Sequence, residues 1–199
     1  ELINKIKDSA KEQNVIHKLL AQYYFQKNDT ENAFKEIEEY AKLEPNSPLI
    51  YQMRALIYEK NGDSFNEHVN WGKYNTLRGN KDVALNEYMI AYQFKNDDVD
   101  LIETIATQLE VSKDKTKACE FYERLLDVQP NNINALQKLA EFRYSIGDYT
   151  IAIDYLDKLK EADSRNQFVL DNYEKYQNEA ENGGNIASFF KNIFGKRMG

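Results

Sequence analysis

Hydrophobic residues recur at steps of three and four along most of the chain, which is the spacing that places side chains on one face of an α-helix. Between residues 133 and 146 this face carries Leu136 and Phe142, among others. Gly147 interrupts the pattern, which then resumes from 151 to 159. The alternation predicts a helix, a tight turn and a second helix that packs against the first.

The helix pairs return with a period of about 34 residues. When 99–132 is aligned with 133–166, the same residue types fall at the same offsets, as Ala118 does with Ala152. Alanine lets the backbones of two helices approach closely, so we expect these alanines at contacts between helices. The low content of Gly and Pro, 8 and 3 residues, also favours an all-α protein over an all-β one.

Small, aromatic and turn residues return at corresponding places in four segments. They are Leu20, Ala21, Tyr24, Ala33, Ile37 and Pro45 in 14–47; Trp71, Gly72, Gly79, Ala84, Tyr88 and Ala91 in 65–98; Ile105, Ala106, Ala118, Tyr122 and Pro130 in 99–132; and Ala140, Tyr144, Gly147 and Ala152 in 133–166. This pattern resembles the tetratricopeptide repeat. The resemblance implies an all-α fold, an α-solenoid of stacked antiparallel helix pairs wound into a right-handed superhelix, with a concave groove that binds a peptide or protein.

We expect one solenoid over 1–182, followed by a separate C-terminal segment over 183–199. The expected parts of the solenoid are a short helix at 2–11, repeats at 14–47, 65–98, 99–132 and 133–166, a degenerate or half repeat at 48–64, and a polar capping helix at 167–181.

The phase of these repeats contains a fault, because Pro45 and Pro130 lie 85 residues apart, about two and a half periods. Either the helix at 65–78 serves as the second helix of a degenerate repeat and later units drift in phase, or the helix at 49–60 stands alone and kinks the stack. We favour continuous antiparallel stacking, with a discontinuity near 60–65.

The C-terminal segment begins with Asn-Gly-Gly-Asn at 182–185, which predicts the end of the helical array and a hinge. In 186–198, apolar residues share one helical face beside several cations; they include Phe189, Phe190, Ile193 and Phe194. Such a face suits peripheral contact with an anionic membrane or docking in a partner's groove. The alternative is that this segment packs on the chain's own last repeat or groove.

The net charge of −7 argues against nucleic acid as a partner, because phosphate binding needs clustered Lys and Arg. A single cysteine, Cys119, cannot form an intramolecular disulfide, which favours a reducing compartment and a cytoplasmic location. An envelope-associated location is the alternative, reached through the C-terminal segment or an anchor before Glu1. The enrichment in Asn, Lys, Ile and Tyr fits an AT-rich bacterial genome.

The sequence predicts no catalytic centre, metal site or cofactor. His17 and His68 are far apart in the sequence and have no second metal ligand nearby. The acidic stretch 96–100 lacks the glycine and the closing glutamate of a calcium loop. No histidine lies close in the sequence to Cys119 to activate its thiol.

Exposed positions on the first helices of the repeats are the candidate partner-binding residues that the resemblance implies. They are Lys18, Gln22, Phe25, Gln52, Leu56, Lys73, Asp100, Glu103, Thr107, Glu110, Asn134, Gln137 and Glu141. Members of the family that grip chaperone C-termini use a Lys and Asn pair on the first helix of one repeat, an Asn on the next, and a Lys and Arg pair on a third. This chain has Lys18 at one such place but Gln22 instead of the Asn, and its corresponding downstream positions hold Glu103, Thr107, Gln137 and Glu141. This departure argues against a cochaperone, and the acidic lining favours a basic or neutral peptide.

Together these features predict a non-catalytic scaffold that binds a peptide or protein. Two alternatives stay open: a membrane-associated assembly or envelope factor, and a regulatory or recruiting subunit of an enzyme complex. The sequence gives no indication of the oligomeric state.

Overall fold

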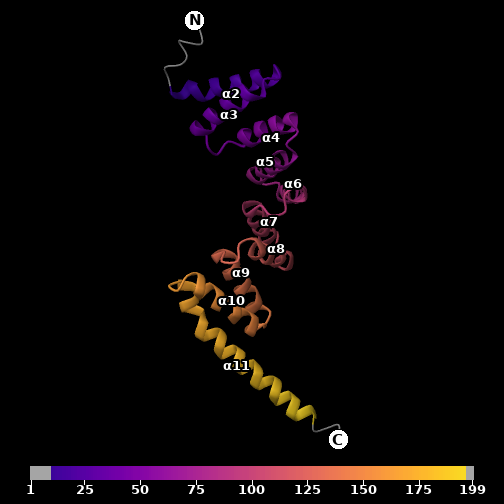
Figure 1. The fold of residues 1–199 in the computed structure, drawn as a ribbon, viewed down its shortest axis with the longest axis vertical. Helices are drawn as coiled ribbons and strands as arrows, with labels where there is room; N and C mark the ends of the chain where they lie inside the picture. Colours follow the sequence, from indigo (N-terminus) through magenta and orange to yellow (C-terminus); the bar gives the residue numbers. More distant parts are fainter. Residues whose placement is uncertain (1–9, 196–199) are drawn as a thin grey trace. The chain divides into compact units, whose positions relative to one another are not determined.

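The computed structural model describes the backbone of residues 10–195 and the side chains of residues 13–182. Within this part of the chain all regular secondary structure is α-helical, and consecutive helices pack against one another from α2 to α6 and from α8 to α11 (Figure 1). The helices are α2 (Ala10–Gln26), α3 (Thr30–Leu43), α4 (Pro48–Asn61), α5 (Ser64–Leu77), α6 (Lys81–Phe94), α7 (Val99–Val111), α8 (Lys115–Val128), α9 (Ile133–Ser145), α10 (Tyr149–Ala162) and α11 (Gln167–Gly195). The predicted all-α class with stacked helix pairs is confirmed. The helix expected at 2–11 lies largely outside the described residues.

The chain divides into two compact units, Glu1–Gln108 and Leu109–Gly199, with the boundary inside α7. In the first unit, α2, α3 and α4 share a core of Ala21, Ala33, Ile37, Tyr40, Ile50, Met53 and Ile57. In the second unit, one buried cluster consists of Leu136, Ala140, Ala152, Leu156, Leu159, Val169 and Tyr176. The repeat alanines of these cores are fully buried, which confirms their predicted place at helix contacts.

Tight turns join the helices of each pair, and each contains one residue in the left-handed region. These residues are Asn28 (φ 61°), Gly62 (φ 73°), Gly79 (φ 77°), Lys113 (φ 65°) and Gly147 (φ 84°). An aspartate or asparagine follows each of them and precedes the next helix. Asp29, Asp63 and Asp114 accept a hydrogen bond from the backbone N–H three residues on, which starts the second helix at a fixed residue.

Helix α5 is the source of the phase fault. A tight turn at Gly62 joins it to α4, a second one at Gly79 joins it to α6, and it packs against both neighbours. Three helices therefore follow one another through two tight turns. Helix α5 acts as the second helix for α4 and as the first helix for α6, and α4 keeps its contact with α3.

Two His–Glu pairs show that α5 and α6 repeat the geometry of α2 and α3. His17 Nδ1 lies 2.6 Å from Glu36 Oε2, and His68 Nδ1 lies 2.7 Å from Glu87 Oε2. In the sequence the second pair follows the first by 51 residues, which is about one and a half periods. The extra half period between the two pairs is occupied by α4.

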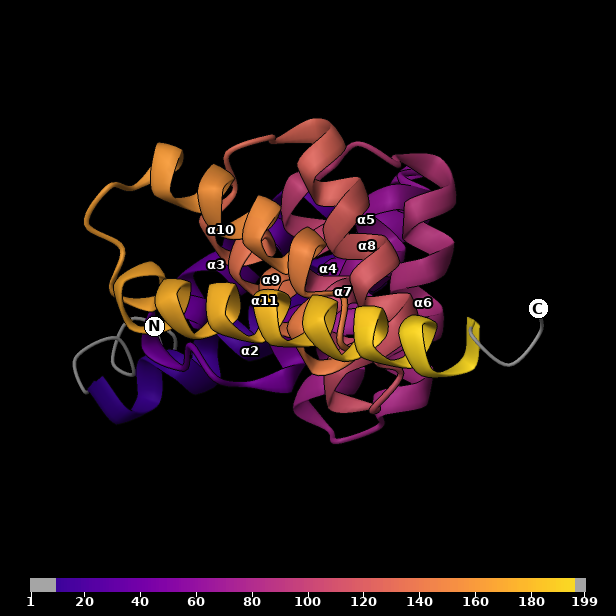
Figure 2. The same ribbon diagram turned by 90° about the horizontal axis from the view of Figure 1, so that it is seen from below.

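Helix α11 corrects one expectation. The sequence at 182–185 predicts a helix end, but α11 runs unbroken from Gln167 to Gly195 (Figure 2). Glycine inside a helix costs about 1 kcal/mol relative to alanine but keeps its backbone N–H, so the hydrogen-bond ladder can continue through it. The side chains of 183–199 lie outside the described residues, so membrane or partner docking by Phe189, Phe190, Ile193 and Phe194 stays a prediction.

Candidate functional site

The first unit contains an open groove of about 610 Å³. Helices α4, α5, α6 and α7 line it with Tyr51, Lys73, Thr76, Leu77, Tyr88, Asp100, Glu103, Thr104, Thr107 and Gln108. The residues of α7 recur at steps of three and four, so one face of that helix forms a wall. Lys73, Thr76 and Leu77 form the corresponding face of α5. In tetratricopeptide-like repeats the first helices line the groove. Helix α5 can therefore line it because it also serves as the first helix for α6.

The start of α7 is fixed by Asp98, which accepts a hydrogen bond from the backbone N–H of Leu101 at 3.0 Å and an ion pair from Lys95 at 2.8 Å. Burial acts to raise the pKa of the Asp98 carboxyl, but the bonds from Lys95 and Leu101 outweigh it and hold the pKa below its ordinary value. Asp98 therefore stays ionised and caps α7. This cap fixes the residue at which α7 begins, and so the places of Asp100 and Glu103 along the groove.

Tyr88 forms the buried end of the groove between α5 and α6. Its side chain is 3% exposed, and its hydroxyl lies 3.2 Å from Thr76 Oγ1. Burial raises the pKa of Tyr88, so the phenol is neutral at physiological pH. The groove is thus lined by the Tyr88 hydroxyl, threonine side chains, two carboxylates and one lysine, a lining that suits hydrogen bonding to a polypeptide.

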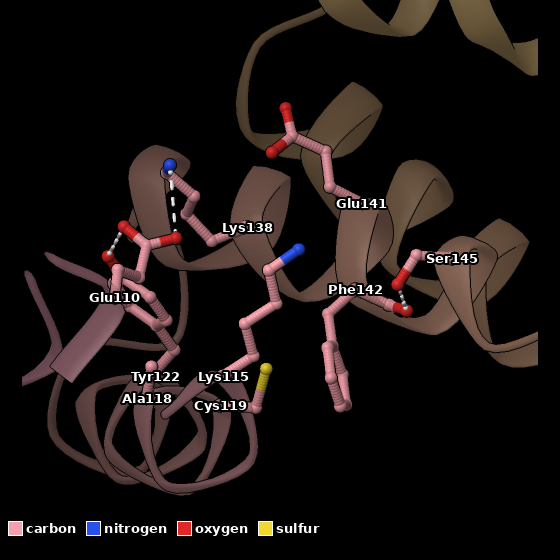
Figure 3. A pocket seen from close by; sticks show the side chains of 9 residues that line it. All are labelled: Glu110, Lys115, Ala118, Cys119, Tyr122, Lys138, Glu141, Phe142 and Ser145. Atoms are coloured by element: carbon pink, nitrogen blue, oxygen red, sulfur yellow. Dashed lines mark hydrogen bonds and ion pairs between the residues drawn. The ribbon is translucent and has the colours of Figure 1, made fainter. Parts of the chain in front are cut away.

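A second, smaller site lies in the second unit, where α8 meets α9 (Figure 3). It is a hollow of about 100 Å³ lined by Glu110, Lys115, Ala118, Cys119, Tyr122, Lys138, Glu141, Phe142 and Ser145. The Tyr122 hydroxyl donates to Glu110 Oε2 at 3.0 Å, and Lys138 Nζ lies 3.2 Å from Glu110 Oε1. Glu110 is thus held by a phenol and an ammonium on its two oxygens.

The thiol of Cys119 faces this hollow (Figure 3). The residue is only 7% exposed, and burial raises the pKa of its thiol to about 12. At neutral pH the thiol is therefore protonated and behaves as a small apolar group. Cys119 is thus a buried small hydrophobe.

The structure divides the candidate partner-binding residues among several places. Lys73, Asp100, Glu103 and Thr107 come together in the groove of the first unit. Glu110 and Glu141 line the hollow of the second unit, and Gln137 Nε2 donates to Glu141 Oε1 at 3.1 Å. The others line neither site; they are Lys18, Gln22, Phe25, Gln52, Leu56 and Asn134.

Phe25 instead supports the fold. The Lys60 ammonium lies 4.2 Å from the centre of its ring and donates to its backbone carbonyl at 3.1 Å. Glu103 and Glu141, both candidate partner-binding residues, belong to different units and line two separate sites.

Sequence reasoning missed part of the groove. Thr76 and Leu77 lie three and four residues after Lys73, so helical spacing alone could have added them. Tyr51 and Tyr88 come from helices that flank α5, and their place in the groove follows from the packing of α5 against both neighbours.

The described residues provide neither a metal-binding cluster nor a membrane-spanning helix. Within that part of the chain, no three His, Cys, Asp or Glu side chains gather closely enough to hold a metal ion. None of the described helices has the length and apolar character needed to cross a membrane.

Comparisons with known proteins agree with the fold. Residues 19–47, from α2 through α3 to the following loop, match a model of the tetratricopeptide repeat family. The structure of PilF from Pseudomonas aeruginosa is similar with a TM-score of 0.50 and 15% identity, covering 93% of each chain. A tetratricopeptide repeat protein from Parabacteroides merdae gives 0.52 and 17%, covering 94% of this chain and 67% of its own. No curated protein matches the sequence significantly.

At these identities the solved structures show a shared fold alone. The repeat match, the 34-residue helix pairs and the stacked architecture together identify the class. The chain carries one tetratricopeptide repeat match at 19–47, and its stacked helix pairs share the fold of tetratricopeptide repeat proteins.

Proposed function

We propose that this protein is a non-catalytic interaction scaffold and that the groove of the first unit binds an extended, basic or neutral peptide segment of its partner. Stacked tetratricopeptide repeats are suited to protein interaction in general. The observation that carries the proposal for this chain is the open groove of about 610 Å³, walled by exposed polar faces of α5 and α7.

The chemistry of the groove suits an extended chain. Hydroxyl, amide and carboxylate groups of Thr107, Gln108 and Glu103 can pair with peptide N–H and C=O groups. Leu77, which is 48% exposed, offers an apolar contact beside them. Because both walls are helices held by their caps and packing, little conformational entropy is lost on the scaffold side when a peptide binds.

The charges of the groove favour a cationic peptide. Asp100 and Glu103 lie on one wall, and Lys73 is the one cation among the residues that line the groove. Ionic attraction at an exposed surface is screened by salt, so affinity should fall as ionic strength rises.

The proposal is tested by selecting peptides from a random displayed library on the intact chain. The double variant Asp100→Lys/Glu103→Lys is compared with Asp82→Lys/Glu120→Lys, which changes the net charge equally. Asp82 is an exposed acid in the first turn of α6, as Asp100 is in α7, and Glu120 is exposed on α8. Neither control residue lines the groove.

We expect the selected peptides to carry a net positive charge, to bind more weakly at high salt, and to lose about tenfold or more in affinity for the groove variant alone. Peptides that bind both variants equally well would refute the groove as the binding site. We also still predict that the protein has no catalytic activity and no cofactor. Its cytoplasmic location and its bacterial origin stay predictions as well.

A further inference from the structure

The first unit contains a further pocket between the start of α3 and the end of α4, with a volume of about 410 Å³. This α3–α4 pocket is lined by Thr30, Glu31, Phe34, Ile57, Tyr58 and Asn61. Sites for small ligands typically have volumes of about 300–1,000 Å³, so the pocket has room for a long side chain. No residue lines both this pocket and the groove, so the two are separate sites.

Two aromatic rings and one acid give the α3–α4 pocket its chemical character. The rings of Phe34 and Tyr58 lie edge-on, with 5.8 Å between their centres, and both side chains are only partly buried. Glu31 is exposed in the first turn of α3. The face of an aromatic ring attracts a cation, and a carboxylate beside it adds a charge-assisted hydrogen bond. This combination favours a cationic ligand that also has apolar surface.

The polar side chains of the α3–α4 pocket form no hydrogen bond or ion pair with another described residue. They are Thr30, Glu31, Tyr58 and Asn61. Their hydroxyl, carboxylate and amide groups are therefore available to a ligand. In the hollow of the second unit, by contrast, Glu110 is already bound by Lys138 and Tyr122.

The cations that lie nearest in the sequence are engaged elsewhere, and none lines the α3–α4 pocket. Arg54 donates two hydrogen bonds to Glu38, at 2.7 and 2.8 Å. The Lys60 ammonium donates to a backbone carbonyl at the end of α2, at 3.1 Å. Lys35 follows Glu31 by four residues but forms no ion pair with it. The charge of Glu31 is thus left for a cation from outside the described chain.

The electrostatic surroundings of Tyr58 also favour a cation. Burial raises the pKa of the Tyr58 hydroxyl, and the carboxylates of Asp63 and Glu38 raise it further, whereas Arg54 acts in the opposite direction. The phenol is therefore neutral at physiological pH and can accept a hydrogen bond from a cationic donor.

The equivalent place in the second unit lacks these features. An offset of 85 residues places α8 and α9 on α3 and α4, so that the helix caps Asp29 and Asp114 correspond. In this register the acid and both rings are lost and two cations appear, through the replacements of Thr30 by Lys115, Glu31 by Thr116, Phe34 by Cys119 and Tyr58 by Arg143. A cationic ligand should therefore be selected in the first unit alone.

We propose that the α3–α4 pocket binds an arginine side chain of a partner protein. The planar guanidinium can stack on an aromatic ring while its N–H groups donate to Glu31, whereas the ammonium of lysine has no flat face for stacking. Its remaining N–H groups can donate to the side-chain oxygens of Asn61 and Tyr58. This site does not depend on the groove, so either can fail without the other.

The test uses the full chain labelled with ¹⁵N and three probes: N-acetyl-argininamide, its neutral analogue N-acetyl-citrullinamide, and N-acetyl-lysinamide. The amide shifts of Phe34 and Tyr58 are followed during each titration. Glu31→Gln removes the acid, and Phe34→Leu removes one ring. Asp82→Asn is the matched control, because Asp82 is likewise an exposed acid in the first turn of a helix and lines neither the pocket nor the groove.

The arginine probe should shift both amides until they saturate, the lysine probe should bind more weakly, and the citrulline probe should leave them unchanged. Glu31→Gln and Phe34→Leu should each weaken arginine binding by about threefold. Asp82→Asn and the groove variant Asp100→Lys/Glu103→Lys should bind the arginine probe as the natural chain does.

Four results would overturn the proposal. They are an arginine probe that leaves the amides unchanged, citrulline or lysine binding as tightly as arginine, unweakened binding to Glu31→Gln, and equal weakening by Asp82→Asn. Loss of arginine binding in the groove variant would place the probe in the groove and would also overturn it. Retained arginine binding in a groove variant that still binds the selected peptides would refute the proposed groove and leave this pocket standing.

Discussion

Gly72 of α5 lies directly against the ring of Tyr88 in α6, and its replacement by alanine tests how these two helices pack. A Cβ atom added at Gly72 would meet the ring of Tyr88, at 2.6 Å from Cδ1 and 2.7 Å from Cζ, and still closer to Cε1. The ring is 3% exposed and its hydroxyl bonds Thr76, so it has little room to move. Either the ring must leave its rotamer or α5 must separate from α6.

The expected loss follows from two opposing terms. Overpacking in a filled core costs about 1–3 kcal/mol, whereas glycine to alanine in a helix gains about 1 kcal/mol in propensity. We therefore expect Gly72→Ala to lower the free energy of unfolding by up to about 2 kcal/mol, measured by urea denaturation followed by circular dichroism.

A second variant isolates the cause. Tyr88→Val removes the ring but keeps an apolar side chain, so in that background Gly72→Ala should no longer be destabilising and should gain about 1 kcal/mol from helix propensity. If Gly72→Ala stabilises the natural chain, or if the two substitutions act additively, the close approach of α5 and α6 is not the reason for this glycine.

Three further changes test the turns, the caps and the buried thiol. Lys113 adopts a left-handed φ of 65°, so Lys113→Gly should raise the free energy of unfolding by about 1 kcal/mol, whereas a loss of stability in urea denaturation would contradict the turn geometry. The pKa of Asp98 is lowered in the folded chain, so its stabilising contribution is present above about pH 4 and is lost as the pH falls through the folded pKa. Asp98→Asn should therefore lower the Tm at neutral pH but have little effect in strong acid; an equal effect at both would show that ionisation is unimportant. Burial raises the pKa of Cys119 to about 12, so iodoacetamide should label this thiol rapidly only after unfolding in urea, and equally rapid labelling of the folded chain, detected by mass spectrometry, would contradict its burial.

Local signals in the sequence were sufficient for the helices and the turns. The three- and four-residue spacing of apolar residues predicts α-helices, because only one face of each helix enters the core. Gly147-Asp148 predicts a turn followed by a helix start, because glycine tolerates positive φ and aspartate can cap the next helix. The same local reasoning failed at 182–185, where the continuing backbone ladder of α11 overrides the preference of two glycines.

The candidate sites could be predicted only in part. Lys73 and Glu103 were found from their exposed faces, but the sequence could not show that they share a groove while Glu110 and Glu141 line another site. Their grouping depends on how helices pack across intervals of about thirty residues, and helical periodicity carries no information about such distances.

The sequence by itself determined a repeating all-α chain, its tight turns and an extra half period in the repeat phase. Only the tertiary structure decided that α5 resolves this half period by packing on both α4 and α6, and that Cys119 lies at a hollow beside Glu110 and Glu141. The physical reason is that backbone preference and amphipathicity act within one helix, whereas grooves and hollows depend on the combined sizes of side chains that different helices bring together.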